Sequence, residues 1–256
     1  MTGPAPDWLT ARPIAHRGLH DALNGVVENS IAAARAAVAA SYGVECDVQP
    51  AKDGDLVVFH DDTLERLTSR DGRVCDFSAG ELTEVALRGG GETIPTFAAF
   101  LAEIAGRAPL VVELKSRFDG DLTGAERAAA LLATYAGPAV IESFDPEPIA
   151  YLRTHAQALG IAHIPLGIVG EAVYSQEEWP MLSPAQRADM LHFLHYPRTR
   201  PDFLSWNVAD LPHAIPVLAR KALGIPVTTW TVRTPGQAEI AKQWADQIVF
   251  EGFRPA

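Results

Sequence analysis

The sequence is poor in cysteine and contains no long apolar run. Its two cysteines, Cys46 and Cys75, favour a reduced cytoplasmic protein, although two thiols are enough for one disulfide. No stretch approaches the roughly 20 apolar residues that a membrane-spanning helix needs. The first ten residues are polar and Pro-rich, and they lack the basic segment followed by an apolar one that marks a signal peptide. We therefore expect a cytoplasmic protein without a membrane span.

The chain also lacks an excess of basic residues. It has 21 Lys and Arg against 32 Asp and Glu, which gives a formal net charge of -11. This balance argues against a nucleic-acid-binding protein and against one that binds membranes through a polybasic surface. Any phosphate site must therefore be made locally positive by a metal ion, Arg or Lys. We expect a small-molecule partner, and the composition leaves the oligomeric state open.

The remaining composition is that of an ordinary globular protein. A chain of 256 residues with 48% hydrophobic and 21% charged residues suits one large α/β domain, or at most two small ones. No repeat, low-complexity tract or clear linker marks a second domain. We therefore expect a single domain over 1–256.

Apolar stretches alternate with helical patterns along the chain. Strands are expected at 12–16, 44–49, 110–115, 139–144, 161–168, 203–208, 225–232 and 247–251. Helices are expected at 31–40, 95–105, 124–135, 146–157, 184–194, 213–222 and 236–244. Asn29 or Ser30 could cap the first helix. Strands that alternate with helices imply a parallel sheet.

Two segments depart from this alternation. The Asp53-Gly54 turn predicts that 55–60 folds back as a hairpin arm. Residues 62–92 are polar and weakly periodic, which indicates an insertion with short helices around 79–86. Eight strand–helix units remain, and eight units in one domain favour a closed (β/α)8 TIM barrel over an open sheet.

Residues that can do chemistry gather where the expected strands end. Glu45 and Asp47 lie two apart on one strand, so they point to the same side while Cys46 points to the other. Two carboxylates aimed at one point repel unless a cation lies between them, and a divalent ion with oxygen ligands is the natural partner. His16 and His60 end two further segments and suggest acid/base chemistry on an anionic substrate.

Other polar residues follow later strands. They are Arg17 after the first strand, Glu113 and Lys115 on the third, Glu142 on the fourth, Trp230 and Arg233 near the end of the seventh and Glu251 at the end of the eighth. Active sites of such barrels lie at the carboxyl ends of the strands, so these residues should share one rim. Glu113 and Lys115 could also be a simple ion pair across the barrel mouth. Trp230 could be a substrate wall or a core residue, and the pattern assigns no role to Glu142.

In its motifs the chain resembles the glycerophosphodiester phosphodiesterase family. The matching segments, in the family's order, are His16-Arg17-Gly18, Glu28-Asn29-Ser30, Glu45-Cys46-Asp47-Val48, Asp53-Gly54, 60–68, Ile94-Pro95-Thr96, Glu113-Leu114-Lys115, Ser143-Phe144 and Thr229-Trp230-Thr231-Val232. Any one of them is weak, but together they are specific. The resemblance implies a TIM barrel of the phospholipase-C-like phosphodiesterase type, in agreement with the element count.

The resemblance also implies roles for individual residues. Glu45, Asp47 and Glu113 would bind a divalent metal ion, either Ca²⁺ or Mg²⁺. His16 and His60 would be the acid/base pair, and Arg17 and Lys115 would hold the phosphate. The segment after His60 resembles the family's insertion over the alcohol end of the substrate.

The end of the chain departs from the family pattern. The last strand of the family usually runs into Thr-Asp-Xaa-Pro, whereas this chain has Phe250-Glu251-Gly252-Phe253-Arg254-Pro255. Arg233 stands where Asn is common. These departures bear on the identity of the substrate rather than on the core reaction, and the role of Glu251 stays open.

The activity implied by the resemblance is hydrolysis of a glycerophosphodiester to an alcohol and glycerol 3-phosphate. Attack by the neighbouring substrate hydroxyl, through a cyclic phosphate, and direct attack by water both remain open. One alternative is phospholipase-D-like or lyase action on lysophospholipids or sugar phosphodiesters. The apolar residues of the insertion, Leu64, Leu67, Phe77, Leu82, Val85 and Leu87, would favour lipids if they were exposed. A second alternative is a phosphate-ligand binding protein without turnover, although none of the expected histidines or metal ligands is missing.

Overall fold

The strands of the chain form one closed barrel. The computed structural model describes residues 5–255, so the first four residues of the polar start lie outside the described part. Within it, nine strands form one sheet. They are β1 (Ile14–Ala15), β2 (Gly43–Pro50), β3 (Leu56–Val58), β4 (Leu110–Leu114), β5 (Ala139–Ser143), β6 (Leu166–Gly170), β7 (Phe203–Asn207), β8 (Val227–Val232) and β9 (Gln247–Phe250).

Closure comes from the first strand, because β1 pairs in parallel with both β2 and β9. Only β3 is antiparallel among these strands, and it folds back on β2 through the pair Val48 and Val58. Removing this arm leaves eight parallel strands. The predicted (β/α)8 barrel and the predicted hairpin arm are both confirmed.

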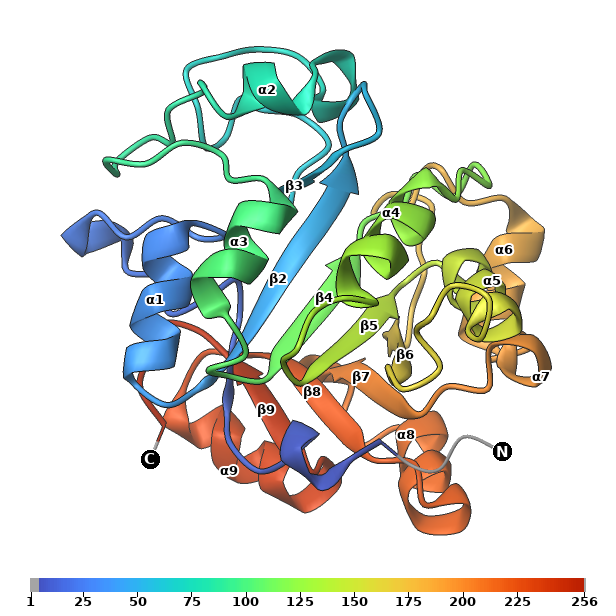
Figure 1. Cartoon of the computed structure of the whole chain (residues 1–256). Coiled ribbons are helices and arrows are strands. Elements are labelled where there is room, and N and C mark those ends of the chain that lie inside the picture. Colours follow the sequence, from blue (N-terminus) through green and yellow to red (C-terminus); the bar gives the residue numbers. More distant parts are fainter. Residues whose placement is uncertain (1–4, 256) are drawn as a thin grey trace.

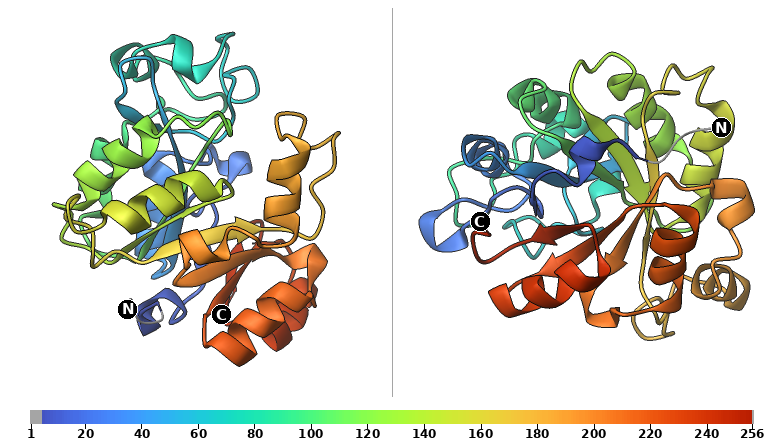
Figure 2. Two further views of the ribbon diagram at one scale, coloured as in Figure 1. Left: turned by 90° about the vertical axis from the view of Figure 1, so that its right-hand side faces the viewer. Right: turned by 90° about the horizontal axis from the view of Figure 1, so that it is seen from below.

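Helices cover the outside of the barrel (Figures 1 and 2). They are α1 (Ile31–Ala39), α3 (Phe97–Ile104), α4 (Thr123–Leu132), α5 (Pro146–His155), α6 (Pro184–Leu191), α7 (Tyr196–Thr199), α8 (Ala214–Leu218) and α9 (Pro235–Trp244), with α2 (Ala79–Leu82) in the insertion. Ser30 caps α1, since its side chain accepts a hydrogen bond from the Ala33 amide. No helix in the described residues has the length and apolar character needed to cross a bilayer.

The barrel strands bury both faces. Cys46 and Val112 face outward and pack with the covering helices in the largest apolar cluster. Val111, Val140 and Phe203 belong to a smaller apolar cluster with Ile14 of β1. Because side chains alternate along each strand, the residue two positions after Val111, Glu113, points to the same side as Val111.

The insertion buries its apolar residues in a cluster that it shares with β3. Figure 1 shows it above the carboxyl end of β2. Leu64, Leu82, Val85 and Leu87 are buried together with Val74, and Leu67 and Phe77 pack against them half-buried. These are the six apolar residues that would favour a lipid substrate if they were exposed. They contact one another instead of forming an open apolar surface.

Two sequence predictions in the second half are wrong in detail. The expected strand at 161–168 begins only at Leu166, because Ile164 donates to the Ile161 carbonyl at 2.8 Å and closes a turn. The apolar residues of this turn are buried in the main core. The sequence pattern of 161–168 is therefore that of a buried strand. The expected helix at 213–222 ends as an α-helix at Leu218 and continues as one π turn over Ala219–Leu223.

A buried ion pair ties α5 to the start of β7. Arg153 Nη2 lies 2.7 Å from Asp202 Oδ2, and the two side chains are 6% and 5% exposed. Asp202 also accepts a hydrogen bond from the Leu166 amide at 2.8 Å. Arg153→Leu should lower the free energy of unfolding by about 3–5 kcal/mol, because it leaves the Asp202 carboxylate buried without its cation. Urea titration at neutral pH measures the loss.

The control for Arg153→Leu is a pair whose arginine is exposed. Arg35 binds Glu103 with two hydrogen bonds and is 60% exposed. Arg35→Ala should change stability by no more than about 1 kcal/mol. Equal losses in the two variants would contradict the role assigned to burial.

His195 should make the protein less stable in mild acid. It is 1% exposed, and burial lowers its pKa from 6.5 to about 4. Below pH 6.5 the unfolded chain binds a proton that the folded chain does not take up until about pH 4. Stability should therefore fall by up to roughly 3 kcal/mol across this window and should be unaffected by this group above it.

Chemical denaturation at a series of pH values tests this contribution. His195→Gln should flatten the fall in stability between pH 6.5 and 4, while the exposed His192→Gln should keep the wild-type slope. If the slopes of the two variants coincide, His195 is not the group responsible.

Candidate active site

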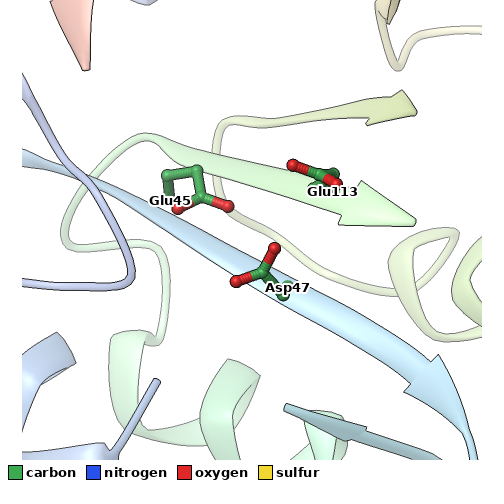
Figure 3. Close-up of side chains that lie close together, drawn as sticks. All are labelled: Glu45, Asp47 and Glu113. Atoms are coloured by element: carbon green, nitrogen blue, oxygen red, sulfur yellow. The ribbon is translucent and has the colours of Figure 1, made fainter. Parts of the chain in front are cut away.

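Three carboxylates meet on two neighbouring strands of the barrel. Glu45 and Asp47 come from β2 and Glu113 comes from β4, and Figure 3 shows their side chains converging. One oxygen from each lies within 4.8 Å of the others. The strand register explains this arrangement, because Asp47 pairs with Glu113 across the two strands. The structure brings together the three residues that the sequence proposed as metal ligands.

The charges of this cluster are only partly balanced by the protein. Lys115 Nζ lies 2.8 Å from Glu113 Oε1 and 3.4 Å from Asp47 Oδ1. Burial alone would raise the pKa of Asp47, but Lys115 and the neighbouring His60 and Arg17 outweigh it and hold that pKa below its usual range. Burial, together with the charges of Asp47 and Glu113, raises the pKa of Glu45 well above its usual range. The negative charge that the protein does not balance therefore acts mainly on Glu45.

The donor set fits a hard divalent cation. Glu45 Oε2 accepts a hydrogen bond from the Arg17 amide at 2.7 Å, whereas its Oε1 is buried and has no hydrogen-bond partner. Asn29 holds Asp47 on both sides, donating to Oδ2 at 2.8 Å and accepting from the Asp47 amide at 3.2 Å. Oriented carboxylate oxygens, one of them unsatisfied, suit Ca²⁺ or Mg²⁺ equally.

His16 follows β1 and is bound to the carboxylate of Glu251. Its Nδ1 lies 2.6 Å from Glu251 Oε2, and Glu251 Oε1 accepts from Arg233 Nε at 2.7 Å. Burial lowers the pKa of His16 in spite of this bond. Burial alone would raise the pKa of Glu251, but its bonds to His16 and His20 outweigh it and hold that pKa far below its usual range. The two positions that depart from the family pattern therefore contact each other beside His16.

His60 follows β3 and is held in the same way. Its Nδ1 lies 2.7 Å from Asp61 Oδ1, so the next residue in the chain orients the ring. Gln49 of β2 donates to the carbonyls of Phe59 and Asp61, both at 2.8 Å, and so fixes the backbone on each side of the histidine. In both histidines Nδ1 is hydrogen-bonded to a carboxylate, so Nε2 is the ring nitrogen left for proton transfer.

Arg17 sits in a tight turn between β1 and α1. Its guanidinium lies 2.6 Å from Glu28 Oε1 and 3.3 Å from Asp47 Oδ2. The next residue, Gly18, has φ +76°, and a Cβ atom there would lie 2.7 Å from the backbone of Ala33. Only glycine fits such a turn. It brings Arg17 and its amide to the carboxylate cluster.

A hollow of about 370 Å³ opens beside the cluster. His60, Glu113 and Lys115 line it together with Trp179 and Trp230. Trp230 packs edge-on against Phe144 with ring centres 5.4 Å apart, and its Nε1 donates to the Ser205 carbonyl. Trp230 therefore lies where a substrate wall was expected, and it also packs against the core.

The sequence predictions include no role in the site for either Asn29 or Glu142. Asn29 was interpreted as a helix cap, whereas its amide binds Asp47 from a left-handed backbone with φ 58°. In the sequence, the Glu28-Asn29 pair directly before a helix is the pattern that marks this role of Asn29.

Glu142 faces Glu113 in the strand register and is buried, and burial and Glu113 raise its pKa well above the usual range. Nothing in the structure gives Glu142 a role.

The sequence profile of the Glycerophosphoryl diester phosphodiesterase family matches residues 16–252. The chain belongs to this family. The matched range runs from His16 to the residue after Glu251 and includes the insertion.

Relatives in the glycerophosphoryl diester phosphodiesterase family align with a smaller part of the chain. A glycerophosphodiester phosphodiesterase of Caldanaerobacter subterraneus is 43% identical over 111 residues, which are 40% of this chain and 44% of that protein. Human glycerophosphodiester phosphodiesterase 1 is 42% identical over 74 residues, 28% of this chain and 21% of that protein. The chain thus spans less than half the length of these relatives.

Solved structures from the same family share the whole fold. A phosphodiesterase of Oleispira antarctica, in complex with the product sn-glycerol-3-phosphate, superposes with a TM-score of 0.73 at 23% identity, covering 93% of this chain and 91% of that one. A glycerophosphodiester phosphodiesterase of Thermotoga maritima gives a TM-score of 0.67 at 21% identity, covering 93% and 94%. At such identities the likeness establishes the barrel and no more.

Proposed function

We propose that this chain, as a single domain, hydrolyses glycerophosphodiesters to an alcohol and glycerol 3-phosphate. The observation that carries the proposal is the cluster of Glu45, Asp47 and Glu113 beside two histidines whose Nδ1 atoms are bound by carboxylates. Membership of the family and the names of the relatives support the same reaction.

The chemistry of the site suits a phosphodiester. A divalent ion, Ca²⁺ or Mg²⁺, held by the three carboxylates would act as a Lewis acid on the phosphate oxygens. Arg17 and Lys115 supply fixed positive charge for the phosphate anion. His16 and His60 each hold a proton or a lone pair at Nε2. One can take the proton of the attacking hydroxyl and the other can protonate the leaving oxygen.

The rival substrates receive less support. A lysophospholipid would need an open apolar surface for its acyl chain, but the apolar residues of the insertion are packed in a cluster with residues of β3. A binding protein without turnover would not need both histidines held by carboxylates.

The unpaired thiols of Cys46 and Cys75 support the proposal that the protein works in the reducing cytoplasm.

Release of the alcohol, choline or ethanolamine, tests the function, and glycerol 3-phosphate is identified as the second product of the two glycerophosphodiesters. The substrates are glycerophosphocholine, glycerophosphoethanolamine and lysophosphatidylcholine, each assayed with Ca²⁺, with Mg²⁺ and with chelator. The expected result is metal-dependent release from the two glycerophosphodiesters and little from the lysophospholipid. Faster turnover of the lysophospholipid would contradict the substrate assignment, and no turnover of any diester would favour a binding role.

A further inference from the structure

Arg66, on the insertion, lies between two carboxylates that come from separate parts of the barrel. Its Nε and Nη2 contact Asp61 at 2.5 and 3.0 Å, and its Nη1 and Nη2 contact Glu28 at 2.9 and 2.8 Å. Each carboxylate is thus bound by two guanidinium nitrogens. Such paired contacts fix the angle as well as the distance between the groups, which a lysine ammonium cannot do.

Each of these carboxylates also holds one residue of the candidate active site. Glu28 Oε1 accepts from Arg17 Nη1 at 2.6 Å, and Asp61 Oδ1 lies 2.7 Å from His60 Nδ1. A continuous path of charged contacts therefore runs from Arg17 through Glu28, Arg66 and Asp61 to His60. Its two ends follow different strands, β1 and β3, and Arg66 joins them.

The charges along this path alternate. Bonds to Glu28 and Asp61 raise the pKa of Arg66, and although burial alone would raise the pKa of Asp61, His60 and Arg66 hold it below its usual range. Loss of Arg66 would leave two carboxylates facing each other with only Arg17 and His60 as partners. Arg17 would then be free to turn toward Glu28, and His60 toward Asp61, which moves both side chains away from the substrate.

We propose that Arg66 is a positioning residue that sets the placement of His60 relative to the phosphate-binding Arg17. Because Arg66 lies on the insertion, the active site is aligned only when the insertion is packed on the barrel. The inference rests on the proposed function, because it concerns the same reaction, but Arg66 itself touches neither of the two reacting histidine Nε2 atoms nor the carboxylate cluster.

The effect should appear in the rate rather than in stability. The Arg66 side chain is 45% exposed, and exposed ion pairs contribute little to the free energy of unfolding. The insertion is held on the barrel by the apolar cluster that it shares with β3. A misplacement of a reacting group by about 1 Å can slow a reaction by about 100-fold.

Arg66→Ala, Arg66→Lys and Arg70→Ala form the test set. Arg70 is a matched control from the same insertion, since its guanidinium lies 4.0 Å from the centre of the Phe77 ring and contacts no residue of the path. Hydrolysis of glycerophosphocholine and the melting temperature are measured for each variant, with and without added guanidinium chloride at concentrations below those that unfold the protein.

The expected result is a 10- to 100-fold fall in kcat for Arg66→Ala, with a melting temperature close to that of Arg70→Ala. Arg66→Lys should recover little of this loss. Added guanidinium should restore several-fold activity to Arg66→Ala and none to Arg66→Lys or Arg70→Ala. Asp61→Asn combined with Arg66→Ala should cost less than the product of the single losses, because both act through His60.

Three outcomes would overturn the inference while leaving the function intact. They are an unchanged kcat in Arg66→Ala, full activity in Arg66→Lys, and a loss of rate that only follows a fall in melting temperature. A wild-type protein that hydrolyses no phosphodiester would instead overturn the proposed function together with the inference.

Discussion

His16→Ala should lower kcat/KM for a glycerophosphodiester by about 100- to 10,000-fold, the usual range for loss of one general acid or base. Two observations carry this expectation. His16 is held by Glu251 at 2.6 Å, and Glu251 is in turn held by Arg233. The ring is therefore fixed with Nε2 available, and alanine leaves no group that can move a proton there. Initial rates at saturating metal and varied substrate measure the effect.

The control for His16→Ala is a histidine on the outside of the barrel. His155 lies exposed at the end of α5, and its Nδ1 bonds to the Tyr151 carbonyl one turn earlier. His155→Ala should keep the wild-type rate. If His16→Ala retains more than about a tenth of the activity, His16 acts only on binding or on structure and the two-histidine scheme is wrong.

The carboxylate cluster could be predicted because its geometry is local. Glu45 and Asp47 share one strand, where a period of two is enough to place them on one side. Glu113 needed one further assumption, that β2 and β4 are neighbours, which the order of a barrel supplies. The alternation of side chains along β2 and the pairing of β2 with β4 are thus enough to bring the three carboxylates together.

The supports of the histidines that come from distant parts of the chain could not be found in this way. His16 and Glu251 are 235 positions apart, and Arg66 reaches Glu28 across 38 positions from within an irregular segment. No local pattern encodes such contacts, because they depend on how the insertion and the last strand pack. The departures at Arg233 and Glu251 were visible in the sequence, but only the structure shows that they contact each other.

The fold shows the same limit. Alternation of strands and helices predicted the barrel, since each unit repeats a local pattern. The turn at 161–164 was missed because its isoleucines are buried like those of a strand, although the ladder with β5 starts only at Leu166. Burial can be inferred from apolar residues, whereas hydrogen-bond partners in another strand cannot.

Glu45→Gln should abolish turnover and at the same time stabilise the metal-free protein. Glu45 is buried beside two other carboxylates, and one of its oxygens has no hydrogen-bond partner. The amide of glutamine can still accept the bond from the Arg17 backbone, but it carries no charge to repel Asp47 and Glu113. In chelator the melting temperature of the variant should exceed that of the wild type by roughly 2–4 °C, which corresponds to about 1 kcal/mol in a domain of this size.

Adding Ca²⁺ or Mg²⁺ should reverse this order. An ion that binds only the folded state stabilises it by about 2.7 kcal/mol at 100 times its dissociation constant. The wild type should gain this amount and Glu45→Gln should gain much less, because one of three ligands has lost its charge. Glu103→Gln, at a carboxylate on the outer helix α3 that is 23% exposed, should respond to metal as the wild type does. Equal metal-induced shifts in wild type and Glu45→Gln, or a less stable Glu45→Gln in chelator, would mean that the three carboxylates are balanced within the protein and do not bind the ion.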